Sequence, residues 1–223
     1  FASAAPSHTP LSLGRCPPDW ASMWKLCRKA IDVVGSTTKY TVSALVGTSL
    51  VLIRTTDVLN MVVGGGLNAA LCKVLKRVIN KSRPEGARYK DPGMPSSHAM
   101  SLGFLSCYTS IILLGLGLAW PQVVAATVLM QVYSLASLVY RIQKGFHTPA
   151  QVQVGYTFGT VNALSWNHFF SHALDCKVGC YLQAGKLPWS MTLGVMFLVG
   201  LVVMERQLRT GFSFRGKKTD LPP

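Results

Sequence analysis

Charged residues are scarce in this chain of 223 residues. They make up 13% of it, and only 8 are Asp or Glu, against 22 Lys and Arg. Hydrophobic residues make up 49% and the mean hydropathy is +0.33, which is typical of a membrane protein rather than a soluble domain. A net charge of +14 in a soluble domain would favour nucleic acid as a partner. Here the basic residues lie between apolar runs, so we expect membrane lipids as partners and no nucleic acid.

The sequence also lacks the usual motifs for metals and cofactors. No Cys pair has the CxxC spacing of a zinc site, so we predict no metal and no cofactor. Cys72 and Cys107 fall inside apolar runs and are expected to be core residues, whereas Cys176 and Cys180 stand four apart and are free either to pair or to stay single. A transporter is disfavoured because there is no inverted repeat and no intramembrane carboxylate.

The N-terminal region differs in character from the rest. Residues 1–19 hold four Pro without periodicity, which predicts an extended arm. Residues 20–36 place Trp20, Trp24 and other apolar residues at three- and four-residue steps, with basic residues on the other side. This pattern predicts an amphipathic helix, either at the membrane surface or packed on the domain.

Six apolar runs follow, and several are shorter than the roughly 20 residues of a straight membrane span. We therefore expect an all-α integral-membrane bundle of six transmembrane helices over 37–205, with the amphipathic helix before it and a basic tail over 206–223. The runs lie at 40–53, 58–75, 99–118, 121–140, 150–170 and 189–204.

The distribution of basic residues supports six spans. With six, the N-terminus, the loops at 76–98 and 141–149 and the tail share one side, which then holds 19 of the 22 Lys and Arg. Only Arg54, Lys177 and Lys186 fall on the other side. The positive-inside rule therefore predicts that these two loops face the cytosol, matrix or stroma.

The first of these loops carries residues suited to binding a phosphate. Lys76 and Arg83 supply two cations, of which Arg can donate two parallel hydrogen bonds to phosphate oxygens. Ser96 and Ser97 stand at the start of the third run, where hydroxyls and free backbone N–H groups bind anions. His98, in the first turn, is positioned to protonate a leaving oxygen.

The second loop completes the constellation. Arg141 ends the fourth run, and His147 follows six residues later on the same membrane face. An imidazole there can attack phosphorus and form a phosphohistidine, which water activated by His98 would hydrolyse. Three cations and a helix start can stabilise the equatorial oxygens of the transition state, so the mechanism requires no metal.

These motifs resemble the three signatures of the type-2 phosphatidic-acid phosphatase superfamily, which comprises six-helix membrane bundles acting on lipid phosphates and polyprenyl pyrophosphates. The string DPGMPSSHA over 91–99 and the string RIQKGFHT over 141–148 are most similar to plastid lipid phosphate phosphatases of the epsilon type. The resemblance runs from about residue 40 to 204. It implies His147 as nucleophile, His98 as general acid and base, and, as phosphate binders, Lys76, Arg83, Ser96, Ser97 and Arg141.

Two residues depart from the usual pattern of that superfamily. Tyr140 stands where Ser usually precedes the Arg of the third signature, and Gln151 stands where Asp usually follows the nucleophile by four residues. The Asp orients the imidazole and stabilises its positive charge. We expect Gln151 to orient the nucleophile through its amide oxygen but not to stabilise the charge.

The expected function is a metal-independent phosphatase of phosphatidic acid or a related lipid phosphate. The alternatives are a polyprenyl pyrophosphate phosphatase and, in another class, an accessory subunit of a larger organellar membrane complex that binds lipid without turnover. Gln151, in place of the usual Asp, is the residue that gives weight to the last of these. The chain begins Phe1-Ala2-Ser3, a plausible mature end after an organellar transit peptide, which predicts a plastid or mitochondrial inner membrane.

Overall fold

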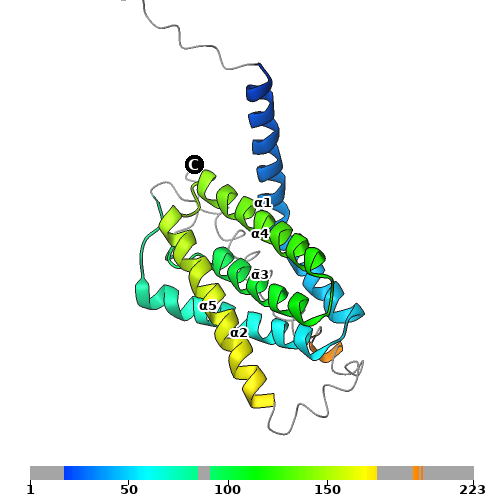
Figure 1. The fold of residues 1–223 in the computed structure, drawn as a ribbon. Helices are drawn as coiled ribbons and strands as arrows, with labels where there is room; N and C mark the ends of the chain where they lie inside the picture. The colour runs from blue at the N-terminus through cyan, green and yellow to red at the C-terminus, as the bar shows by residue number, and fades with distance from the viewer. Residues whose placement is uncertain (1–17, 85–90, 175–192, 196, 198–223) are drawn as a thin grey trace, which may run out of the picture.

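The computed structural model describes residues 18–84, 91–174, 193–195 and 197, and every regular element within them is a helix (Figure 1). The prediction of an all-α fold is confirmed for this part of the chain. The N-terminal arm before residue 18, the C-terminal tail, nearly all of the sixth expected span and the Cys176–Cys180 pair lie outside the described residues. In chain order the helices are α1 (Pro18–Leu52), α2 (Thr56–Ile79), α3 (Ser97–Gly115), α4 (Trp120–Gln143) and α5 (Pro149–Leu174).

Helix α1 is continuous over 35 residues, whereas the sequence analysis expects a helix at 20–36 and a separate span at 40–53. The small polar residues between these two segments do not interrupt the helix. The hydroxyls of Thr37 and Thr38 donate to the carbonyls of Val33 and Val34, one turn earlier, at 2.7 and 2.6 Å. Such back-bonding satisfies a hydroxyl inside a helix, so the chain has no reason to break there. In Figure 1 the first turns of α1 extend beyond the other helices.

Helices α2, α3 and α4 are long and apolar enough to cross a membrane. Only 22–39% of the apolar window of each is buried inside the protein, so most of their hydrophobic surface faces outward. An outward apolar surface of this extent is stable in lipid but not in water. The count of six spans stays a prediction.

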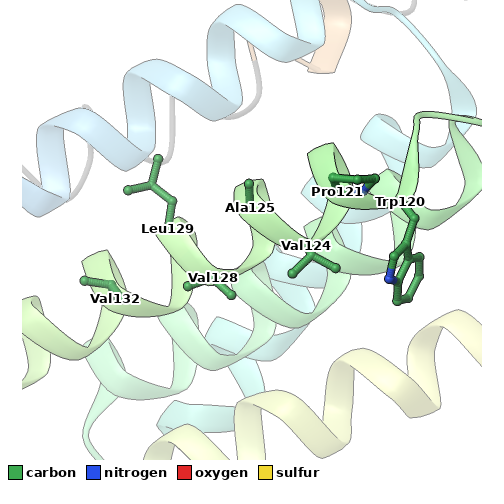
Figure 2. Close-up of a pocket in the computed structure, with 7 residues that line it drawn as sticks. All are labelled: Trp120, Pro121, Val124, Ala125, Val128, Leu129 and Val132. Carbon is green, nitrogen blue, oxygen red and sulfur yellow. The ribbon is translucent and has the colours of Figure 1, made fainter.

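A shallow apolar groove of about 630 Å³ runs along the outer face of α4 (Figure 2). It lies near the start of the helix, far from Arg141 at the other end. Its lining offers no group that could act on a phosphate, so we assign it to the lipid-facing surface and not to the reaction. The residues that line it are Trp120, Pro121, Val124, Ala125, Val128, Leu129 and Val132.

Helices α3 and α5 pack closely against each other. Glycines face backbone carbonyls across their interface: a Cβ at Gly103 would lie 2.3 Å from the Tyr156 oxygen, and one at Gly159 would lie 2.1 Å from the Met100 oxygen. No side chain fits at such separations, and small residues are what permit close helix packing in membranes. This packing holds the first turns of α3 and α5 side by side, and both turns carry predicted site residues.

Candidate active site

Two left-handed residues turn the chain at the ends of α2 and α4. Asn80 has a φ of 42° and its N–H donates to the Lys76 carbonyl, and Gly145 has a φ of 69° and donates to the Ile142 carbonyl. Left-handed caps of this kind end helices and redirect the chain. The loops that follow meet at one end of the bundle, where Nη1 of Arg83 lies 3.3 Å from Nε2 of His147.

The two cations of the first loop share one carboxylate, which the sequence analysis did not single out. Nζ of Lys76 lies 3.0 Å from Oδ2 of Asp91, and Nη2 of Arg83 lies 3.0 Å from both carboxylate oxygens. Burial alone would raise the pKa of Asp91, but the hydrogen bonds and charges of Lys76 and Arg83 outweigh it and hold that pKa below its usual value. The site therefore carries an ionised acid beside its cations at neutral pH. The signal for Asp91 was present in the sequence, at the start of the string DPGMPSSHA over 91–99.

The side-chain amide of Gln151 orients the ring of His147. Its Oε1 lies 3.2 Å from Nδ1 of His147 and also accepts the backbone N–H of Thr148 at 3.2 Å, while its Nε2 donates to the Ser82 carbonyl at 2.8 Å. The last two contacts fix which end of the amide is the acceptor. Nδ1 of His147 must then carry the proton, so Nε2 presents its lone pair toward Arg83.

His147 is held in the neutral form. Its side chain is buried, and burial is the main cause that lowers its pKa to about 4 from an ordinary value of 6.5. The positive charges of Arg83, Arg141 and Lys76 lower the pKa further, and the hydrogen bond to Gln151 only partly opposes them. At pH 7 Nε2 is therefore unprotonated, in a field that attracts anions, and its lone pair is directed at Nη1 of Arg83.

His98 lies in the first turn of α3, and its partner comes from α4. Nε2 of His98 lies 3.0 Å from the hydroxyl of Ser137, which is fully buried. The sequence analysis missed Ser137 because a single Ser within an apolar run gives no signal of its own. The segment before α3 is joined to the start of α5 through the backbone, since the Ser96 N–H donates to the Gln151 carbonyl at 3.1 Å.

The other predicted phosphate binders differ in exposure. Ser96 is fully buried, and its hydroxyl is without a hydrogen-bond partner among the residues that the structure describes. Ser97 is exposed at the first position of α3. Arg141 is half-buried at the end of α4, with its guanidinium 5.1 Å from the centre of the Phe146 ring, and its charge acts on His147. A hydroxyl buried without a partner is costly.

No protein-family model matches the chain. It is 33% identical to lipid phosphate phosphatase epsilon 1, chloroplastic, of Arabidopsis thaliana over 179 residues. This match covers 77% of this chain and 62% of the relative. Lipid phosphate phosphatase epsilon 2, chloroplastic, of the same plant is 33% identical over 132 residues, covering 57% of this chain and 45% of that protein. The chain thus spans about three fifths of the first relative's length and less than half of the second's.

Among solved structures, the fold is similar to that of a transmembrane PAP2 type phosphatidylglycerolphosphate phosphatase from Bacillus subtilis. The TM-score is 0.54 at 20% identity, covering 71% of this chain and 79% of the other. In sequence the chain is thus similar to two plant lipid phosphate phosphatases, and in fold to a PAP2 type membrane enzyme. Its outward apolar helices are those of a membrane protein.

The two departures from the superfamily pattern are both accommodated in this chain. A Cβ at Gly35 of α1 would lie 2.1 Å from Cγ of Tyr140, so the absence of a side chain on α1 makes room for the ring. Gln151 uses both ends of its amide, and a carboxylate in its place would direct an oxygen at the Ser82 carbonyl. An amide satisfies such a donor-and-acceptor pair, whereas an ionised acid only accepts.

Proposed function

We propose that the protein is a lipid phosphate phosphatase that hydrolyses a phosphomonoester through a phosphohistidine at His147. The observation that carries this proposal is the 3.3 Å contact between Nε2 of His147 and Nη1 of Arg83. The other ring nitrogen of His147, Nδ1, is hydrogen-bonded to Gln151. A phosphorus atom in front of Nε2 would have its oxygens within reach of Arg83 and Lys76. These are the two requirements of phosphoryl transfer by a nucleophilic side chain: an available lone pair and cations around the equatorial oxygens.

The proposed reaction has two steps. In the first, Nε2 of His147 attacks phosphorus, the bond from phosphorus to the lipid oxygen breaks, and His98 supplies a proton to that oxygen. In the second, His98 takes a proton from water, the resulting hydroxide attacks phosphorus, the bond from phosphorus to Nε2 of His147 breaks, and inorganic phosphate leaves. We assign the phosphate oxygens to Lys76, Arg83, Arg141, Ser97 and the buried hydroxyl of Ser96. General acid–base catalysis of this kind contributes about 10²- to 10⁴-fold.

The decisive experiment measures release of phosphate from phosphatidic acid in mixed micelles, with a chelator present, by the wild type and by His147→Ala. We expect the variant to lose at least about 10³-fold in kcat and to accept no ³²P label from labelled substrate. His168→Ala is the matched control, because His168 is an exposed residue toward the far end of α5, about five turns away from the site. Equal rates for the wild type and His147→Ala, or a requirement for a divalent ion, would overturn the mechanism.

The names of the two plant relatives favour phosphatidic acid or a related lipid phosphate as the substrate and a plastid membrane as the location. We propose that the loops carrying the site face the stroma, in line with the distribution of basic residues over six spans. A panel of phosphatidic acid, phosphatidylglycerolphosphate and a polyprenyl pyrophosphate tests the substrate, and protease protection of intact plastids tests the orientation.

A protein that binds lipid phosphate without turnover, as a subunit of a larger complex, is the competing hypothesis. It predicts phosphate binding with no release by either the wild type or His147→Ala. The orientation that Gln151 gives His147 favours turnover, because an idle site has no need of a single ring tautomer.

A further inference from the structure

A carboxylate of the chain occupies the cations that we assign to the substrate. Asp91 accepts from Lys76 at 3.0 Å and from Nη2 of Arg83 through both oxygens at 3.0 Å. The Arg83 Nε–H also donates to the Asp91 carbonyl at 3.1 Å. Charge-assisted hydrogen bonds from Lys and Arg to an oxyanion are also the means by which these residues hold a phosphate.

The contacts of Arg83 leave little room for an additional anion. Its Nη1 faces the Phe146 carbonyl at 3.1 Å and Nε2 of His147 at 3.3 Å, and its Nη2 faces Asp91. A phosphate bound in front of His147 must therefore take donors from one of these acceptors. The Phe146 carbonyl is part of the backbone next to the nucleophile, whereas the Asp91 side chain lies in a loop.

Exposure identifies Asp91 as the acceptor that can leave. Its side chain is 51% exposed, against 13% for Lys76 and 10% for Arg83. A carboxylate that swings away from the site would regain water at once, while the two largely buried cations would lose the charge-assisted hydrogen bonds that it gives them. Their desolvated charges then favour any anion that replaces the carboxylate.

We propose that Asp91 is an internal competitor of phosphate, which the incoming phosphate group displaces and which returns to expel inorganic phosphate after hydrolysis. The inference rests on the proposed function and adds to it a residue that sets how tightly the site holds phosphate. The competitor weakens the binding of substrate and product by the same factor, since each must break the same contacts. Its benefit is faster product release, because the cations are never left without a counter-charge.

The test compares the wild type with Asp91→Asn and Asp91→Glu. Asn keeps the size and removes the charge, so we expect the inhibition constant of inorganic phosphate and the KM for phosphatidic acid both to fall by about tenfold, which corresponds to roughly one charge-assisted hydrogen bond. Glu keeps the charge and is expected to stay close to the wild type. If Asp91 merely positioned Lys76 and Arg83, its removal would loosen the two cations. Both constants would then rise instead of falling, because phosphate would bind more weakly.

Binding of inorganic phosphate followed by ³¹P NMR separates this inference from the proposed function. The measurement is made on His147→Ala and on His147→Ala with Asp91→Asn, neither of which needs to turn over substrate. Tighter phosphate binding by the double variant supports the competitor even if no phosphatase activity is found. Unchanged or weaker binding overturns it, and the midpoint of thermal unfolding checks that the variants remain folded.

Discussion

The hydroxyl of Ser137 lies 3.0 Å from Nε2 of His98 and orients this ring. Ser137 sits one turn before Arg141 on α4, so one helix carries both a proposed phosphate-binding cation and the partner of the proposed acid. Because Ser137 is fully buried, its orientation is set by packing and does not depend on solvent.

We expect Ser137→Ala to lower kcat by about 10- to 100-fold with little change in KM, because the ring would lose its hydrogen bond while the phosphate binders stay in place. Steady-state phosphate release measures both constants. Ser134→Ala is the matched control, since Ser134 is also buried on α4, one turn earlier. An equal loss in both variants would mean that the effect comes from packing.

The protonation of His147 gives a second prediction. Its pKa is lowered to about 4, so the ring is neutral at pH 7 and becomes protonated only as the pH falls toward 4. Acid should therefore remove the nucleophile well below the ordinary histidine range around 6.5. NMR of ¹³C-labelled histidine follows this directly, with the signal assigned by its absence in His147→Ala. A midpoint near 6.5 would contradict the burial and the cation field described above.

A third prediction concerns Gln151, the neutral hydrogen-bond partner of His147. Gln151→Glu is almost isosteric but introduces a negative charge beside Nδ1, which stabilises the protonated ring. We expect the midpoint of His147 to rise above that of the wild type, and the acid limb of kcat/KM to move to higher pH with it. The substrate ionises identically in both enzymes, so the difference between the two profiles reports on the enzyme alone. An unchanged midpoint would show that the introduced carboxyl is itself protonated. A protonated carboxyl could donate to the Ser82 carbonyl, which accepts from the amide of Gln151 in the wild type.

The helices could be predicted from the sequence where an apolar run lies between two polar loops. Helices α2 to α5 begin and end within a few residues of the expected runs for this reason. The prediction failed at the middle of α1, because a Gly-Ser-Thr-Thr segment is typical of a break in a chain, whereas here the hydroxyls bond to carbonyls one turn back. The periodicity of apolar residues does not reveal whether a hydroxyl will mark a break in a helix or bond to a carbonyl inside it.

The site could be predicted in part for a related reason. Arg83 and His147 stand in polar loops, and Lys76, His98 and Arg141 stand in the helix turns next to them, where their chemistry is visible in the sequence. Ser137 contacts His98 from another helix, and Asp91 contacts Lys76 and Arg83 from within the same segment of the chain. The fold was needed to reveal these contacts, although Asp91 itself stands in the string over 91–99. The proposed roles of all these residues stay predictions until variants are assayed.

The pairing of Gly35 with Tyr140 gives the last prediction. A Cβ at Gly35 would lie 2.1 Å from Cγ of the ring, so Gly35→Ala forces α1 away from α4 or the ring out of its place, at a cost of about 1–3 kcal/mol. Gly47→Ala is the control on the same helix, because a Cβ there meets nothing within 4 Å, and it should be neutral or stabilising by about 0.5–1 kcal/mol.

Replacing the ring by the residue usual in the superfamily should relieve the clash. Tyr140→Ser alone leaves a void, but in combination with Gly35→Ala the loss of stability should be smaller than the sum of the two single losses. The midpoint of thermal unfolding in detergent measures all four proteins. Additive losses would mean that the two residues do not act on each other, and that the larger side chain before Arg141 is tolerated for a reason other than the space that Gly35 leaves.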